Sequence, residues 1–488
     1  MKQIRVVVRS TLWIAVTPFA LLAPKLRKGI LGLALMAILP CHLAAGAGIY
    51  ALPIYSGTNA IAAIAYGAFD QAQPGNQLAC LMGNGSIFEL TLGPSGWTAT
   101  NIFVFHGDVL PWQNPGTRVS LKIGSVLSEI AGKELVLSYY GRIFAIYHDP
   151  SIGWTNQIIA DNSDFVGTSW DMDVGNCDPS HPGDEVFGIY ETVYDFSTGT
   201  VYEKQDGIWD ADVVYYAEVG MGAAIGHSNP DFPQNDVVVV TEMGPAYEIV
   251  PPATGGPGPW PMRTIWDDFV NAGWVVRIGD VYPQDPTNQI VYGTRYSDSI
   301  MVSQYNGTNS QNLNILYTGI NTNVDNDNMW DVAIAQVFPA TPASPDKQIL
   351  GVDESGSVYV VQDVTNQWQG SILWQDTSPL YAVLPVDMLP TQGDEVVVAG
   401  ASGTVTLLCD PAPVLNLASI AQGRSVISWT GITGVTYTIE TTTNLQSGSS
   451  WNQLTNLTCQ GAFSGGLSYT NVEADAASER FFQVKANW

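Results

Sequence analysis

The sequence WVVRIGDVYPQDPTNQIVYG, residues 274–293, decides the fold: it joins an alternating strand, a turn of Pro, Asp and Asn, and a second apolar strand. It returns as SWDMDVGNCDPSHPGDEVFG at residues 169–188 and as MWDVAIAQVFPATPASPDKQILG at residues 329–351, and four fainter copies make seven. One position aligns the copies at intervals of 50 to 57 residues, and it is occupied by Gly67, Gly124, Gly175, Gly226, Gly279, Ala335 and Pro385. Repetition at this interval, with strand periodicity inside each copy, predicts an all-β fold, a seven-bladed β-propeller over residues 48–410.

Each repeat supplies short β runs separated by turn residues, as four-stranded antiparallel blades require. The seventh repeat stops early, after TVTLLCD at residues 404–410. We expect GIYALPIYSG, residues 48–57, to provide its missing outer strand. This would join the two ends of the ring and remove an exposed sheet edge.

The first 47 residues contain six basic residues and no acidic ones, an apolar stretch at 29–39, and the small residues Ala45, Gly46 and Ala47. This pattern predicts a signal peptide over residues 1–47. A retained membrane anchor is the alternative, and only that alternative would make a membrane a partner. Removing the segment leaves 12 basic against 45 acidic residues, a net charge of −33, which excludes nucleic acid as a partner. The acidic surface is explained by solubility outside the cell, by cation binding or by attraction to basic partners.

Four cysteines follow residue 47, at Cys80, Cys177, Cys409 and Cys459. They are too scattered for a zinc motif, and four cysteines allow three complete pairings, so no disulfide is assigned.

The repeated sequence does not recur after Asp410, and residues 411–488 predict a small β-sandwich. The order VISWTG, YTIETTTNL, WNQL, RFFQVKA resembles the fibronectin type III modules at the C-termini of secreted bacterial proteins. The resemblance implies a spacer, sorting or adhesion module without catalytic residues. The propeller itself resembles the FG-GAP and VCBS class, through GDVYP at residues 279–283.

Many members of that class bind calcium through alternating carboxylates. Here prolines in CDPSHPGDE and YPQDPTNQ replace several of those ligands, which argues against calcium in every blade. Another loop, NVDNDNMWD, predicts one calcium site from its dense oxygen ligands, at Asp325, Asp327 and Asp331. An Asn/Asp-rich turn without a metal explains the same residues.

Successive side chains of an inner strand point in opposite directions. We expect the apolar set to pack between blades and the other set to face the central channel, namely Ser120, Lys122, Asp171, Asp173, Val275, Arg277 and Asp331. The latter set predicts either a pocket for a sugar, a small polar ligand or an ion, or a water-filled channel with compensated charges. A register error of one residue would exchange the two sets.

Three tryptophans begin inner strands at equivalent positions. Aromatic faces at a propeller mouth can stack on sugar rings, whereas their regular recurrence equally indicates core packing. The predicted ligand-binding residues are therefore Lys122, Trp170, Asp171, Asp173, Trp274, Arg277, Trp330 and Asp331.

Few groups are available for catalysis, and no catalytic residue is assigned. His181 and His227 follow inner strands of adjacent repeats and are candidates for proton transfer, as in propeller-type polysaccharide lyases. We predict a secreted or cell-surface binding or adhesion protein that recognises carbohydrate or an extracellular protein. A polysaccharide lyase or glycoside hydrolase, and a scaffold with no small ligand, are the alternatives.

Overall fold

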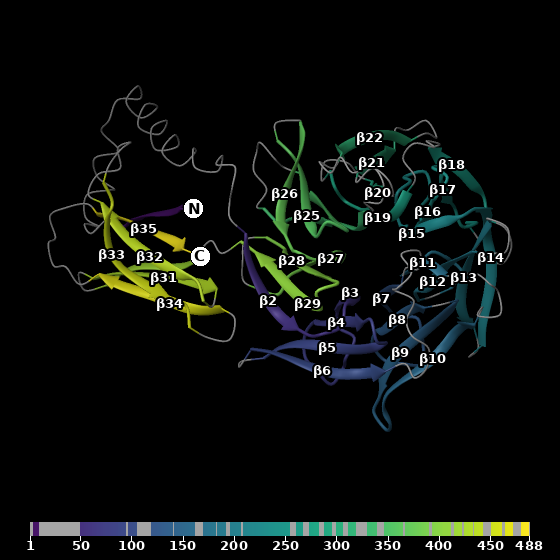
Figure 1. Ribbon diagram of the computed structural model, residues 1–488, viewed down its shortest axis with the longest axis horizontal. Helices are drawn as coiled ribbons and strands as arrows, with labels where there is room; N and C mark the ends of the chain where they lie inside the picture. Colours follow the sequence, from purple (N-terminus) through teal and green to yellow (C-terminus); the bar gives the residue numbers. More distant parts are fainter. Residues whose placement is uncertain are drawn as a thin grey trace, which may run out of the picture.

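A computed structural model describes residues 3–8 and 49–487 (Figure 1). Within these ranges it does not describe residues 94–95, 105–118, 140, 162–168, 182, 192–195, 206–207, 254–259, 267–272, 283–286, 295–298, 306–310, 319–328, 339–345, 365–366, 390–392, 411–413, 422–423, 433, 443–449, 461–463 and 472–479.

Seven four-stranded antiparallel sheets form a ring, which confirms the predicted seven-bladed β-propeller (Figure 1). Blade 1 consists of β3 (Ile61–Gly67), β4 (Gln77–Met82), β5 (Ser86–Gly93) and β6 (Gly96–Val104). Blade 2 consists of β7 (Ser120–Gly124), β8 (Glu134–Tyr139), β9 (Arg142–Asp149) and β10 (Gly153–Asp161). Blade 3 consists of β11 (Ser169–Gly175), β12 (Glu185–Glu191), β13 (Phe196–Gln205) and β14 (Ile208–Glu218). Blades 4 and 5 consist of β15 (Gly220–Gly226), β16 (Asp236–Thr241), β17 (Ala246–Ile249) and β18 (Met262–Trp266); and β19 (Gly273–Gly279), β20 (Gln289–Thr294), β21 (Ser299–Tyr305) and β22 (Gln311–Thr318). Blades 6 and 7 consist of β23 (Met329–Ala335), β24 (Gln348–Asp353), β25 (Ser357–Asp363) and β26 (Trp368–Gln375); and β27 (Leu380–Val386), β28 (Glu395–Gly400), β29 (Thr404–Cys409) and β2 (Tyr50–Ser56).

The ring is closed by β2, as predicted. This strand pairs antiparallel with β29, from Tyr50 opposite Cys409 to Ser56 opposite Thr404. The outer strand of the last blade is thus supplied by the segment that precedes the first blade, and blade 7 is completed by both ends of the propeller sequence.

The core of the propeller lies between blades. Leu81 of blade 1 and Leu121 of blade 2 belong to one buried cluster, and Val291 of blade 5 and Ile349 of blade 6 belong to another. Corresponding clusters join each remaining pair of neighbouring blades. Burying each such aliphatic side chain contributes about 1.5–3 kcal/mol, so the ring is stabilised chiefly by contacts between sheets.

Close packing between inner strands explains the repeated glycine. A Cβ on Gly279 would lie 2.8 Å from Ile334 of the next blade, and one on Gly175 would lie 3.1 Å from Ile225. In both cases the neighbour is the residue just before the equivalent position of the following repeat. A larger side chain at these glycines would therefore force the inner strands apart.

A second repeated feature is a buried hydrogen-bond acceptor at the first residue of each second strand. Glu134 Oε2 accepts from the backbone N–H groups of Val126 (2.8 Å) and Leu127 (3.2 Å). At least one such bond forms in every blade, to Gln77, Glu134, Glu185, Asp236, Gln289, Gln348 and Glu395. These acceptors fix the loop that follows each inner strand, because its buried N–H groups find no partner in the sheet.

The remaining strands form a small β-sandwich of two sheets. One sheet has the order β30 (Val414–Ala421), β31 (Arg424–Ile432) and β34 (Ser464–Asn471), and the other has β1 (Gln3–Val8), β35 (Arg480–Asn487), β32 (Thr436–Thr442) and β33 (Asn452–Thr458). Trp429, Tyr437 and Phe482 are buried between them.

Strand β1 comes from the segment predicted to be a signal peptide, of which only residues 3–8 are described. The signal peptide stays a prediction, and its removal would leave β35 at the edge of its sheet. Among the described residues there is no helix of the length and apolarity needed to cross a membrane. None of Cys80, Cys177, Cys409 and Cys459 forms a disulfide.

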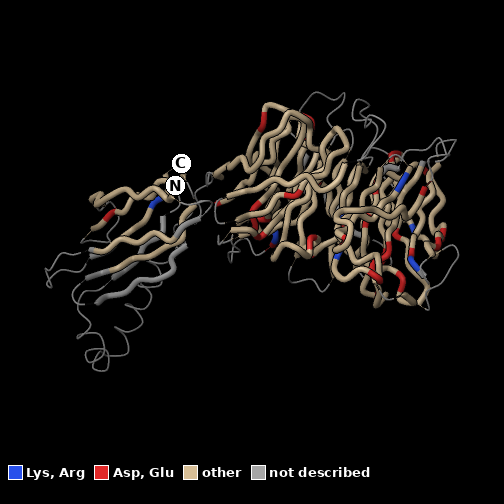
Figure 2. Tube along the Cα trace, turned by 90° about the horizontal axis from the view of Figure 1, so that it is seen from below, with Lys and Arg blue, Asp and Glu red and all other residues tan. Residues whose placement is uncertain are grey.

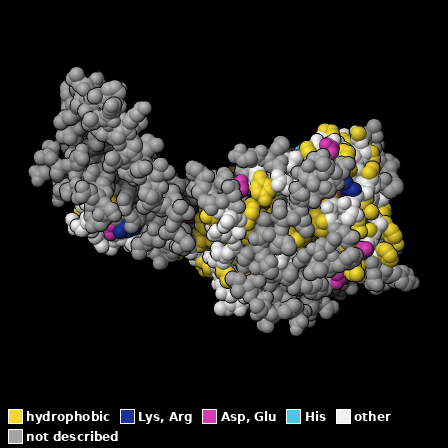
Figure 3. Space-filling view, turned by 90° about the horizontal axis from the view of Figure 1, so that it is seen from above, with side chains coloured by type: hydrophobic (Ala, Val, Ile, Leu, Met, Phe, Trp, Pro, Cys, Tyr) yellow, Lys and Arg dark blue, Asp and Glu magenta, His cyan; other side chains and the backbone are white. Residues whose placement is uncertain are grey.

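Acidic residues are spread through the described parts of the blades and outnumber basic ones (Figure 2). On the side of the propeller shown in Figure 3, apolar side chains reach the surface at several separate places among scattered charged ones.

Candidate functional site: the channel cavity

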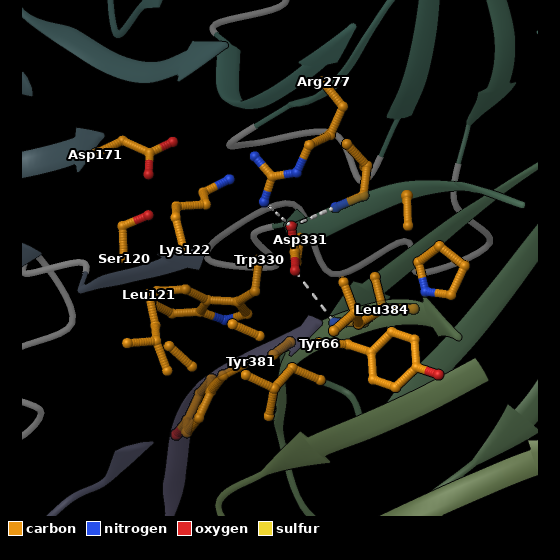
Figure 4. A pocket seen from close by; sticks show the side chains of 18 of the residues that line it. Tyr66, Ser120, Leu121, Lys122, Asp171, Arg277, Trp330, Asp331, Tyr381 and Leu384 are labelled. Atoms are coloured by element: carbon orange, nitrogen blue, oxygen red, sulfur yellow. Dashed lines mark hydrogen bonds and ion pairs between the residues drawn. The ribbon is translucent and has the colours of Figure 1, made fainter. Parts of the chain in front are cut away.

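The inner strands enclose a cavity of about 690 Å³ in the channel of the propeller (Figure 4). Its wall is built from β3, β7, β19, β23 and β27, with Asp171 contributed by β11. Lys122 and Arg277 extend toward one another across it, with Asp171 nearby and Trp330 and Tyr381 on the opposite side (Figure 4). We call this space the channel cavity.

Two ion pairs organise the charged side of the channel cavity. Lys122 Nζ lies 3.2 Å from Asp173 Oδ1, and Arg277 pairs with Asp331 at 2.5 Å. Burial acts to lower the pKa of Arg277, but the carboxylates of Asp331, Asp171 and Asp173 outweigh it and raise that pKa above its usual value. Arg277 is therefore a permanent cation held by acidic neighbours.

The same polar side chains also connect each blade to the next. Asp171 Oδ2 accepts from the backbone N–H of Ala223 (3.3 Å), and Asp173 Oδ2 accepts from that of Ile225 (2.9 Å). Asp331 Oδ2 accepts from Val383 N–H (3.2 Å), and Ser120 Oγ donates to the carbonyl of Met172 (3.2 Å). These polar side chains therefore connect neighbouring blades and also contribute to the cavity wall.

These contacts correct the predicted directions of the side chains. The apolar set packs toward the preceding blade, as Val276 does against blade 4. The other set does not simply face the channel: it points to the following blade, and Val275 is fully buried against blade 6. Both faces of a propeller blade are covered by neighbours, and residues of both sets, such as Leu121 and Lys122, contribute to the cavity wall.

Five of the predicted ligand-binding residues line the channel cavity, and they are Lys122, Asp171, Arg277, Trp330 and Asp331. Asp173 adjoins it through its ion pair with Lys122. The predicted position of Trp274 at the channel mouth is wrong, because this side chain has no exposed surface and packs against Val219 and Met221.

The side chain of Trp170 and the predicted calcium ligands Asp325 and Asp327 lie outside the described residues. The third calcium ligand, Asp331, already accepts hydrogen bonds from Arg277 and from two backbone N–H groups. Calcium binding there stays a prediction, and it would have to compete with these donors.

Tyr381 is a cavity residue that sequence analysis missed. Its ring meets Trp330 edge to face, with centroids 5.4 Å apart, and Trp330 meets Trp274 in the same way at 5.7 Å. Burial and the nearby charge of Glu354 raise the pKa of Tyr381, so its hydroxyl stays protonated. The predicted alignment of the seventh repeat at Pro385 is wrong by one residue. Val386 pairs with Glu395 as Ala335 pairs with Gln348, and this register places Tyr381 at the position of Trp330.

The two candidate histidines have separate surroundings. His181 Nδ1 lies 2.6 Å from Glu203 Oε2, whereas His227 Nδ1 lies 3.3 Å from the carbonyl oxygen of Gln234. No histidine lines the channel cavity in the described part of the chain.

No protein family and no curated protein sequence matches this chain. Among solved structures, the crystal structure of BBS1N in complex with ARL6DN, soaked with mercury, is similar at 11% sequence identity and a TM-score of 0.48, over 74% of this chain and 96% of that one. The structure of YCF48 from Cyanidioschyzon merolae is similar at 15% identity and a TM-score of 0.43, over 74% of this chain and 99% of that one.

Proposed function

We propose that this chain is a secreted or cell-surface binding protein that holds a small neutral carbohydrate in the channel cavity. The observation that carries the proposal is the pairing of an aromatic corner, Trp330 and Tyr381, with charged hydrogen-bonding groups inside one 690 Å³ space. Cavities of about 300–1,000 Å³ are usual for small-molecule sites. Aromatic rings can pack against the C–H faces of a sugar, while charged side chains bond its hydroxyl groups.

Charge balance favours a neutral ligand. Lys122 and Arg277 are each paired with a carboxylate, and Asp171 adds a third acidic group. A polyanionic glycan would have to break these ion pairs and approach a protein of formal net charge −27. A neutral sugar can bond the same groups without separating them. The predicted signal peptide supports a location outside the cell.

The proposal is tested with a glycan array and calorimetry on the purified chain, using neutral mono- and oligosaccharides. Tyr381→Ala should weaken binding at least tenfold, because it removes one wall of the aromatic corner. Tyr216→Ala is the matched control, since Tyr216 is 63% exposed on an outer strand and should leave affinity unchanged. Thermal melts would establish that both variants are folded.

Three results would overturn the proposal. Release of new reducing ends or unsaturated products would make the chain a glycosidase or lyase. Capture of a protein partner without any saturable glycan binding would make it a scaffold. Equal loss of affinity in both tyrosine variants would move the ligand away from the channel cavity.

A further inference from the structure

Blade 3 carries a cluster of polar side chains that is separate from the channel cavity. Asp178 and His181 lie in the turn after β11, and Glu203 lies on β13. His181 Nδ1 is 2.6 Å from Glu203 Oε2 and 3.7 Å from Asp178 Oδ2. One ligand-type atom from each residue lies within 4.8 Å of the other two. We call these residues the blade 3 triad.

Hydrogen bonds hold Asp178 in place for this arrangement. Its Oδ1 accepts from the backbone N–H and the hydroxyl of Ser180, at 2.8 and 2.7 Å. Its own N–H donates to Glu185 Oε2 at 3.0 Å. These bonds hold Oδ1, and Oδ2 faces His181, so the carboxylate is oriented before any ligand arrives.

The neighbourhood of the triad is crowded with negative charge. Burial and the carboxylates of Asp178, Asp212 and Asp210 raise the pKa of Glu203, and His181 opposes this shift. Burial, Asp210 and Asp178 likewise raise the pKa of Asp212, again against the effect of His181. A bound cation would neutralise part of this concentration of carboxylates.

The propeller fold does not require this cluster. Glu203 follows Tyr202, the cross-strand partner of Val186, and therefore lies beside Glu185. The same alignment places uncharged residues at this position in every other blade, namely Thr91, Tyr147, Val250, Gln304, Gln362 and Cys409. Like charges on adjacent strands are destabilising, so blade 3 departs from its own repeat at a cost in stability.

We propose that Asp178, His181 and Glu203 bind a first-row divalent transition metal ion, for which Zn²⁺ is the suitable probe. Imidazole nitrogen with two carboxylate oxygens is a donor set that such ions accept, whereas Ca²⁺ and Mg²⁺ favour oxygen donors alone. Tetrahedral bonds of about 2.0 Å put ligand atoms roughly 3.3 Å apart. The distances of 2.6 and 3.7 Å from His181 Nδ1 to Glu203 Oε2 and to Asp178 Oδ2 lie on either side of that separation. Three protein ligands leave one position for water or another donor. The ion would fasten the turn after β11 to the third strand of the same blade.

The test is calorimetric titration of the full chain, first freed of metal with a chelator, with Zn²⁺ and separately with Ca²⁺. Co²⁺ absorption provides a second readout of nitrogen ligation. We expect one equivalent of Zn²⁺ to bind, and His181→Gln and Glu203→Gln each to weaken binding at least tenfold. His227→Gln is the matched control, because His227 also follows an inner strand but lies outside the triad. Thermal melts without metal distinguish lost binding from lost folding.

Failure to bind Zn²⁺ saturably, or undiminished binding by both triad variants, would overturn the proposal. Ca²⁺ binding that depends on Glu203 but not on His181 would overturn the assignment to a transition metal. Because the triad lies outside the channel cavity, glycan binding and metal binding succeed or fail separately.

Discussion

Two of the buried acceptors at the start of the second strands, in blades 2 and 3, are acids with a raised pKa. Glu134 and Glu185 are buried acids, and burial raises the pKa of each from 4.5 to about 7 although backbone N–H groups oppose the shift. At the equivalent positions Gln77, Gln289 and Gln348 accept the same kind of bond without a charge. The repeat thus contains its own comparison of a titrating and a neutral acceptor.

We expect stability to fall as the pH rises from about 4.5 to about 7, because these acids lose in this range the protons that the folded state holds. Between the two values the folded state binds more protons than the unfolded state, so the stabilisation is complete below the lower pKa and lost above the higher one. Glu134→Gln should therefore raise the free energy of unfolding at about pH 8 by on the order of 1 kcal/mol and flatten its pH dependence. Urea denaturation at several pH values measures both effects.

Gln289→Glu is the reverse control and should introduce a comparable pH dependence into blade 5. An unchanged slope in both variants would contradict the assignment of these acceptors as the titrating groups.

The buried hydrogen-bond acceptor at the start of each second strand could have been predicted from the sequence. It follows the glycine of the repeat by ten residues in each of the first five copies, as Glu134 follows Gly124. The aligned glycines were found because they recur in the sequence. They recur because each one lies close to a side chain of the next blade's inner strand. The ion pairs of the channel cavity, such as that between Lys122 and Asp173, were not found, because they join different repeats and depend on how adjacent blades face each other.

Strand β2 is the element on which closure of the ring depends. It was predictable, because the seventh repeat lacks an outer strand and residues 48–57 resemble one. Its contact with blade 1 was not predictable. In this contact Tyr55 stacks on Phe88, with ring centroids 4.3 Å apart and planes inclined by 30°. Sequence pattern identifies strands and their number, but it does not show which side chain meets the neighbouring sheet.

Tyr55→Ala should destabilise the propeller by about 1–3 kcal/mol, because it removes a partly buried ring from the junction between blades 7 and 1. Tyr216→Ala provides a matched stacked tyrosine, packed on Phe196 at 5.7 Å but largely exposed, and should change stability by less than about 0.5 kcal/mol. Denaturant unfolding of both variants checks the difference. Equal effects would mean that the Tyr55 contact does not strengthen the closure.

At the scale of the whole molecule, the excess of acidic residues opposes the compact state. The chain has 45 acidic and 18 basic residues, and several acids lie close together in blade 3. Repulsion among them is long-ranged at low ionic strength and is screened by salt.

The melting temperature should therefore rise when NaCl is increased from roughly 0.01 M to about 1 M, where the screening length falls from about 30 to about 3 Å. Differential scanning calorimetry over this range of NaCl concentrations measures the melting temperature. A melting temperature that falls with NaCl would mean that attractive ion pairs such as Arg277 with Asp331 outweigh the repulsion.

The pairing of β2 with β29 also sets an order in time. Tyr50 and Cys409 are 359 positions apart, and the first of them is synthesised tens of seconds before the second at usual rates of translation. Until then the apolar side of β2 has no sheet to join, and blade 7 lacks its fourth strand. The ring can be completed only after synthesis has passed residue 409, so a chain interrupted earlier remains an open arc with uncovered edges.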